Sequence, residues 1–96
     1  MKPPRFQGMQ PIPFDRPVLI YFGKPGRTRT VSSVFEAEHC LKNEKWPGKR
    51  KVAWQQAINV MDAIKLSQAT PDEARQSFER AAEEAGILAI VRDVHG

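Results

Sequence analysis

PVLIYFGKPGRTRTV, residues 17–31, contains two strand patterns separated by a turn signal. The first six residues are rich in β-branched and aromatic side chains, and their run is long enough for a strand but too short for a helix. Residues 24–27 fit a type II turn, because Pro25 fixes φ at the second position and Gly26 supplies the positive φ of the third. Residues 27–31 then alternate polar and β-branched side chains. The stretch predicts an antiparallel β-hairpin in which Arg27 and Arg29 face water.

A helix is predicted directly after the hairpin. Ser33-Val34-Phe35-Glu36 has the spacing of a capping box, in which the Ser33 hydroxyl accepts from the Glu36 amide and the Glu36 carboxylate accepts from the Ser33 amide. Pro47 disfavours helical backbone at Trp46, so this first helix should end at about residue 44 or 45.

Two further helices follow from spacing and caps. Residues 49–65 repeat apolar side chains at intervals of three and four, which predicts the second helix. Thr70-Pro71-Asp72-Glu73 combines an N-cap threonine, a proline at the first helical position and acidic first-turn residues, so it predicts the start of the third helix. Gly86 stands where a glycine would end that helix. We expect Trp54, Ile58, Met61 and Phe78 to be buried together between the second and third helices.

The two ends of the chain complete the predicted architecture. Residues 1–13 hold four of the eight prolines and no apolar periodicity, which predicts a flexible proline-rich arm ahead of one small domain, residues 14–96. Residues 87–91, ILAIV, are compatible with a short buried strand. The predicted fold class is therefore α+β: an N-terminal β-hairpin, three helices and a short C-terminal strand that returns to the hairpin.

Charge is distributed unevenly along the sequence. Residues 1–51 carry eleven basic and four acidic side chains, 11 − 4 = +7, whereas residues 52–96 carry four basic and seven acidic ones, 4 − 7 = −3. The single cysteine, Cys40, excludes an internal disulfide, and no apolar run is long enough for a signal peptide or a membrane span. We expect a cytoplasmic protein without a membrane partner.

The stretch KNEKWPGKRK, Lys42–Lys51, is the densest positive segment, with five basic residues and one acid. It connects two predicted helices and places three cations at the start of the second one, where the helix dipole disfavours positive charge. Free helical amides beside cations would suit a phosphate, and a tryptophan could stack on a base. The candidate anion or nucleic-acid site is Lys45, Trp46, Lys49, Arg50 and Lys51. The alternative is a solvated connector without a ligand.

No catalytic, cofactor or metal site is predicted. His39 and Cys40 are adjacent on a helix and point in different directions, and with His95 they are too few for a tetrahedral zinc site. Cys40 is interpreted as a small core residue. The acidic residues of the third helix are explained by its cap and its solvated face.

The order of these motifs resembles a family of small, largely rhizobial alphaproteobacterial proteins known as domain of unknown function 982. The resemblance covers about residues 14–91. Its matching positions are RTVSSV at 29–34, Glu36-Ala37, Leu41, Trp46-Pro47, Arg50, Ala57, Glu73-Ala74-Arg75, Phe78, Ala81-Ala82 and EAGI at 84–87. These positions are mostly caps, turns and core residues, so the resemblance implies a fold and a source but no reaction.

Taken together, these features favour a non-enzymatic cytoplasmic module that binds a protein partner or has a regulatory role. The alternative is a nucleic-acid or phosphate binder that uses the basic connector, Lys42–Lys51. An enzyme ranks third, because no motif of catalysis is present in the sequence.

Overall fold

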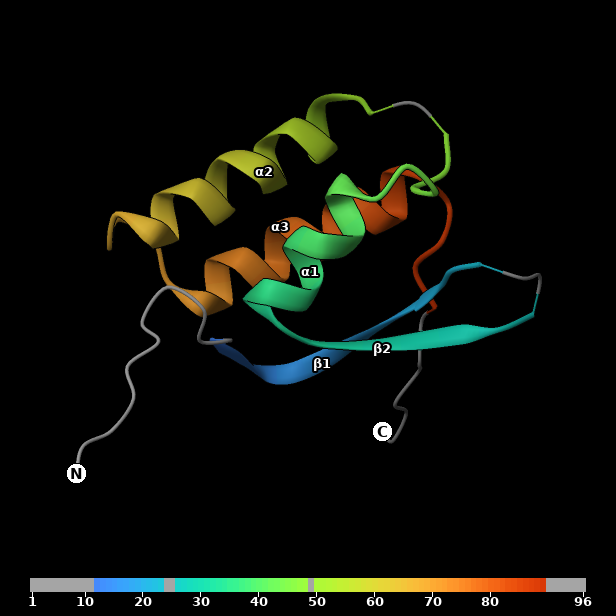
Figure 1. Ribbon diagram of the computed structural model, residues 1–96, viewed down its shortest axis with the longest axis horizontal. Helices are drawn as coiled ribbons and strands as arrows, with labels where there is room; N and C mark the ends of the chain where they lie inside the picture. Colours follow the sequence, from blue (N-terminus) through green and yellow to red (C-terminus); the bar gives the residue numbers. More distant parts are fainter. Residues whose placement is uncertain (1–11, 24–25, 49, 90–96) are drawn as a thin grey trace.

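The computed structural model describes residues 12–23, 26–48 and 50–89. Its elements are β1 (Pro13–Tyr21), β2 (Thr28–Ser33), α1 (Val34–Lys42), α2 (Val52–Lys65) and α3 (Pro71–Glu84). β1 and β2 form an antiparallel hairpin, and the three helices lie on one side of it (Figure 1). The predicted α+β class, with its N-terminal hairpin and three helices, is confirmed.

The hairpin begins earlier than the sequence predicted. Val18 lies opposite Val31 and Ile20 opposite Arg29, while an irregularity between Pro13 and Val18 shifts the register so that Pro13 lies opposite Ser33. The Ile12 carbonyl also accepts a hydrogen bond from the Val34 amide. Residues 12 and 13 therefore belong to the folded domain rather than to the predicted arm, and the rest of that arm, residues 1–11, lies outside the described residues.

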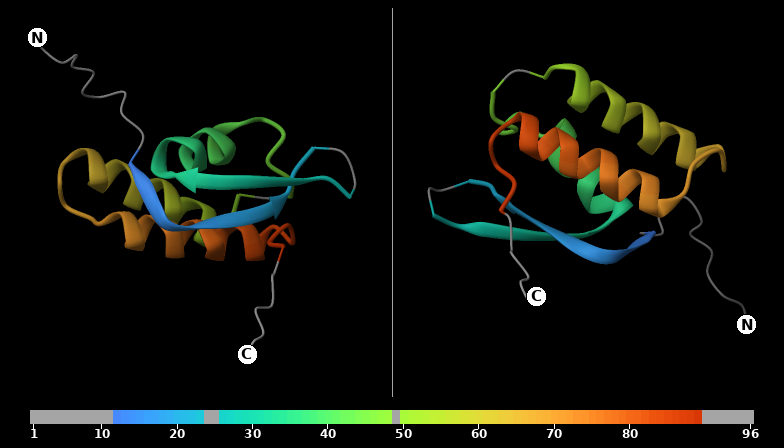
Figure 2. Two further views of the ribbon diagram at one scale, coloured as in Figure 1. Left: turned by 90° about the horizontal axis from the view of Figure 1, so that it is seen from below. Right: turned by 180° about the vertical axis from the view of Figure 1, so that it is seen from behind.

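The chain returns to the hairpin after α3, on the edge of β1 opposite β2. The Tyr21 amide donates to the Ile87 carbonyl at 2.8 Å, and the Ala89 amide donates to the Leu19 carbonyl at 2.9 Å. Leu88 forms an isolated antiparallel bridge with Ile20. Within the described residues this return is a bridge and not the predicted strand, and residues 90 and 91 of that prediction lie outside them. Figure 2 shows the segment turning back from α3 to β1.

Capping residues close in the sequence determine both ends of α3. At α3 both halves of the capping box form: the Glu73 amide donates to the Thr70 hydroxyl, and the Thr70 amide donates to the Glu73 carboxylate. Gly86 has a φ of 76° just after the helix, as its position predicted. The connector between α1 and α2 is longer than expected, because α1 ends at Lys42 and α2 begins only at Val52.

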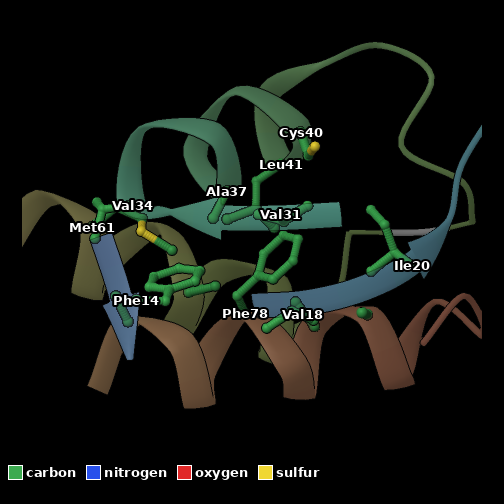
Figure 3. Packing of buried hydrophobic residues seen from close by; sticks show 14 of the residues in the cluster. Phe14, Val18, Ile20, Val31, Val34, Ala37, Cys40, Leu41, Met61 and Phe78 are labelled. Atoms are coloured by element: carbon green, nitrogen blue, oxygen red, sulfur yellow. The ribbon is translucent and has the colours of Figure 1, made fainter. Parts of the chain in front are cut away.

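Phe78 of α3 lies near the middle of the apolar core. Its side chain is fully buried and points toward Val31 of β2 and Leu41 of α1 (Figure 3). The fully buried Met61 brings α2 into the same cluster. The fully buried Cys40 is also part of it, which agrees with its interpretation as a core residue.

The tryptophan in the core is Trp46 rather than the predicted Trp54. Trp46 is 4% exposed, and its ring lies 6.4 Å from the ring of Phe22 and 5.9 Å from that of Phe78, measured between centroids. Trp54 and Ile58 are only partly buried. The prediction is confirmed for Met61 and Phe78, and it is wrong for Trp54 and Ile58 as fully buried residues. The connector turns inward after α1, and its Trp46 indole packs between Phe22 and Phe78.

Candidate functional site

The outer edge of β2 offers unpaired main-chain groups. The main-chain groups of Leu19 and Tyr21 bond to residues 87–89. Because main-chain groups alternate in direction along a strand, the amides and carbonyls of Val18 and Ile20 point toward β2. The amides and carbonyls of their partners, Val31 and Arg29, therefore point toward β1. Thr28 and Thr30 direct their amides and carbonyls away from the hairpin, where no other element of the described chain pairs with them, and Ser32 directs its amide to the same side.

Ser32 is protected at this edge by its own helix. Its amide donates to the Glu36 carboxylate at 2.7 Å, and its hydroxyl donates to the same oxygen at 3.1 Å. The sequence predicted the Ser33 amide as this donor, and that half of the capping box was wrong, because the Ser32 amide points away from β1 and reaches the carboxylate instead. The hydrogen bond from the Ser32 amide, supported by the charge of Arg29, holds the pKa of Glu36 below its ordinary value.

The open edge borders an uncovered face of the hairpin. Thr30 lies opposite Leu19 and Thr28 lies opposite Tyr21, and these pairs face away from the helices. Both threonines are exposed, and Tyr21 is 48% exposed. Arg29 lies on the helix side and is half-buried, so the prediction that it faces water was wrong, whereas Arg27 is exposed.

The basic connector is less available than its sequence suggested. Lys45 and Lys51 are exposed, and Lys49 lies outside the described residues. Trp46 is buried and cannot stack on a base without leaving the core. The Arg50 guanidinium lies 5.1 Å from the centroid of the Trp54 ring, and its Nη2 donates to the Asn43 carbonyl at 2.8 Å.

Two amides in the first turn of α2 already donate hydrogen bonds to a carboxylate, that of Glu84. The Ala53 amide donates to one oxygen of Glu84 at 3.0 Å and the Trp54 amide to the other at 3.2 Å. Two of the free helical amides that the candidate anion site required are thus occupied by a carboxylate from the end of α3. Sequence reasoning missed Glu84 because this cap joins residues about 30 positions apart.

His39 and Cys40, adjacent on α1, lie in different surroundings. Burial raises the pKa of the Cys40 thiol, which disfavours the reactive thiolate. His39 is exposed on the neighbouring position of α1. Residues 12–23, 26–48 and 50–89 contain no cluster of three or more histidine, cysteine or acidic side chains suited to a metal ion. None of the helices in these ranges is long and apolar enough to cross a membrane.

Comparison with known proteins agrees with the family predicted from the sequence. Searches of curated proteins and of solved structures found no significant match. A family described as protein of unknown function (DUF982) matches residues 16–89, a range that contains all three helices, β2 and β1 from Arg16 onward. The chain therefore belongs to the DUF982 family.

Proposed function

We propose that this protein is a non-enzymatic, cytoplasmic protein-binding module whose partner adds a strand to the outer edge of β2. The observation that carries the proposal is the unpaired main chain at Thr28 and Thr30. Strand addition uses such an edge for affinity and the neighbouring side chains for specificity.

The extent of the edge limits the mode of binding. The Ser32 amide already donates to Glu36, so the edge segment with unpaired main-chain groups is short. Each main-chain hydrogen bond that a partner forms there contributes only about 1 kcal/mol in water. Further contact area is available on the adjacent face, where Tyr21 and Leu19 flank the threonines. The partner is therefore expected to pair with β2 and to cover the Tyr21 side chain.

Nucleic-acid or phosphate binding through the connector is the second candidate. The exposed cations Lys45 and Lys51 support it. It ranks below strand addition, since Arg50 is held by Trp54 and Asn43 and the amides of α2 are held by Glu84. Neither candidate involves a chemical reaction or a cofactor.

Affinity capture from the native cell with three baits tests strand addition. Thr30→Pro removes an amide that points away from β1, so the hairpin keeps its own hydrogen bonds. Thr30→Val is the matched control, because it changes the same side chain and keeps the amide. The proposal expects a protein that is captured by the wild type and by Thr30→Val but not by Thr30→Pro, with circular dichroism showing that all three baits are folded.

A double variant, Lys45→Gln with Lys51→Gln, tests the second candidate. Under the protein-binding proposal it captures the same partner as the wild type, and oligonucleotides bind no tighter than about 10⁻⁴ M at physiological salt. Sub-micromolar oligonucleotide binding that this double variant abolishes would replace strand addition by nucleic-acid recognition. Equal capture of the partner by Thr30→Pro and the wild type would remove the edge of β2 from the interface.

A further inference from the structure

Arg29 brings a positive charge to the outer edge of β2 on the side of the helices. The carboxylate of Glu36 marks this edge, because it is bound by the Ser32 amide, which points away from β1. That hydrogen bond and the charge of Arg29 both hold the pKa of Glu36 below its ordinary value. The Arg29 charge therefore acts at the open edge, although the side chain is half-buried.

Arg27 continues the same row of side chains. Its carbonyl accepts from the Phe22 amide at 3.3 Å, so the hairpin ladder extends one residue beyond the start of β2. The Phe22 ring packs near Trp46 on the side of the helices, and opposite residues of a hairpin share a face, so Arg27 belongs to that side too. Neither Arg27 nor Arg29 forms an ion pair with another residue of the described ranges.

The charges at this edge leave a position for one more acid. Two arginines face a single glutamate, 2 − 1 = +1, and Glu36 already accepts from both the amide and the hydroxyl of Ser32. The main chain of Arg29 bonds to β1, so on the outer side Arg29 is at a non-hydrogen-bonded position, where the side chains of facing strands are closest. An added strand therefore places one side chain directly opposite Arg29, and an acidic side chain there is favourable.

The same arginines disfavour antiparallel pairing between two copies of this edge. A pairing centred on Arg29 sets the two Arg29 side chains opposite each other, and one centred on Thr28 sets Arg29 of each copy opposite Arg27 of the other. Like charges at opposite positions destabilise a sheet. A pairing centred on Thr30 requires the Ser32 amide, which already donates to Glu36. The edge therefore fits a different chain that supplies an acid.

We propose that the strand added to β2 is an acidic extended segment of another protein, with a glutamate or aspartate opposite Arg29. Its main chain pairs with Thr28 and Thr30. Its carboxylate lies between the guanidinium groups of Arg27 and Arg29, which bind it through charge-assisted hydrogen bonds. This inference rests on the proposed strand addition and narrows the partner to one chemical class.

Nitrogen-15 NMR of the full chain tests the partner class with three blocked peptides, TVTETVT, TVTQTVT and TVTKTVT, at millimolar concentration. The glutamate peptide should shift the amides of Thr28 and Thr30 and bind about tenfold more tightly than the lysine peptide, with the glutamine peptide between them. Equal shifts with all three peptides, or no shift of the two amides with the glutamate peptide, would overturn the acidic partner. Capture by Thr30→Pro tests strand addition separately.

A double variant, Arg27→Gln with Arg29→Gln, tests the two cations. It should bind the glutamate and lysine peptides about equally while the glutamine peptide still shifts Thr28 and Thr30, because the main-chain pairing is unchanged. Arg16→Gln with Arg80→Gln is the matched control, since these exposed arginines lie beside β1 and α3, away from the outer edge of β2.

Circular dichroism checks that each variant is folded. Arg27→Gln alone, at an exposed position, provides the test if the loss of the half-buried Arg29 unfolds the double variant. It should reduce the preference for the glutamate peptide by about threefold. A preference that stays at the wild-type value in a folded variant would show that these guanidinium groups do not select the partner.

Discussion

Ser67 is the one non-glycine residue in the described chain with a positive φ, at 60°. It ends α2 in a tight turn, in which the Ser67 amide donates to the Ile64 carbonyl and the Gln68 amide donates to the Ala63 carbonyl. Glycine adopts this left-handed conformation without the steric cost that a side chain imposes.

Ser67→Gly is therefore expected to raise the free energy of unfolding by about 0.5–1 kcal/mol. Gly86→Ala is the reverse comparison, since Gly86 also has a positive φ and should lose stability by at least a similar amount. Urea denaturation of both variants measures the two effects. A less stable Ser67→Gly would show that the serine side chain compensates for the backbone cost.

Glu84 is the residue whose role the sequence indicated least. Glu84→Ala should destabilise the fold by about 1–2 kcal/mol, because two amides at the start of α2 lose their acceptor. Glu83→Ala, on the neighbouring exposed position, is the control and should stay within about 0.5 kcal/mol of the wild type. Equal losses for the two variants in thermal or urea unfolding would contradict the capping role.

At the scale of elements, the helix ends are connected by side chains from the next helix. The Trp54 indole of α2 donates to the Leu41 carbonyl near the end of α1, and Glu84 of α3 accepts from the first turn of α2. The local caps at Ser33 and Thr70 could be predicted because all their atoms lie within four residues. The caps made by Trp54 and Glu84 could not, since they depend on how the helices pack.

The junction of β2 and α1 should respond to pH through Glu36. Its folded pKa lies below the ordinary value of 4.5, so its stabilising contribution is present above that value and is lost as the pH falls through the folded pKa. Glu36→Gln should consequently be less stable than the wild type at neutral pH, and the difference should shrink in acid. Denaturant unfolding from neutral to acidic pH measures this. A difference that does not change with pH would mean that the carboxylate charge is unimportant.

At the scale of the whole molecule, Trp46 connects the hairpin, the connector and α3. Trp46→Ala should cost about 3–5 kcal/mol, because the ring is buried between Phe22 and Phe78. Trp54→Phe should cost only about 1 kcal/mol, mainly through the lost hydrogen bond to the Leu41 carbonyl. Urea denaturation compares them, and a larger loss for Trp54→Phe would reverse the assignment of the core tryptophan.

The sequence predicted the class of the fold, but it did not predict the state of the candidate anion site. Trp46 and Arg50 looked available because proline, glycine and lysine surround them in the chain. Tertiary packing buries the indole and places the guanidinium on Trp54. The open edge of β2 could not be predicted from the sequence either, since a strand pattern does not indicate which edge of the strand will be paired.

The return of residues 87–89 to β1 has a consequence for how the protein is made. During synthesis β1 is translated before the three helices, and the segment that bonds to Leu19 and Tyr21 is translated after them. The acceptor for the first amides of α2 also arrives late, because it is Glu84. A ribosome-bound chain that stops before α3 should therefore lack a stable fold, so that this domain completes its folding only after α3 and residues 87–89 have been translated.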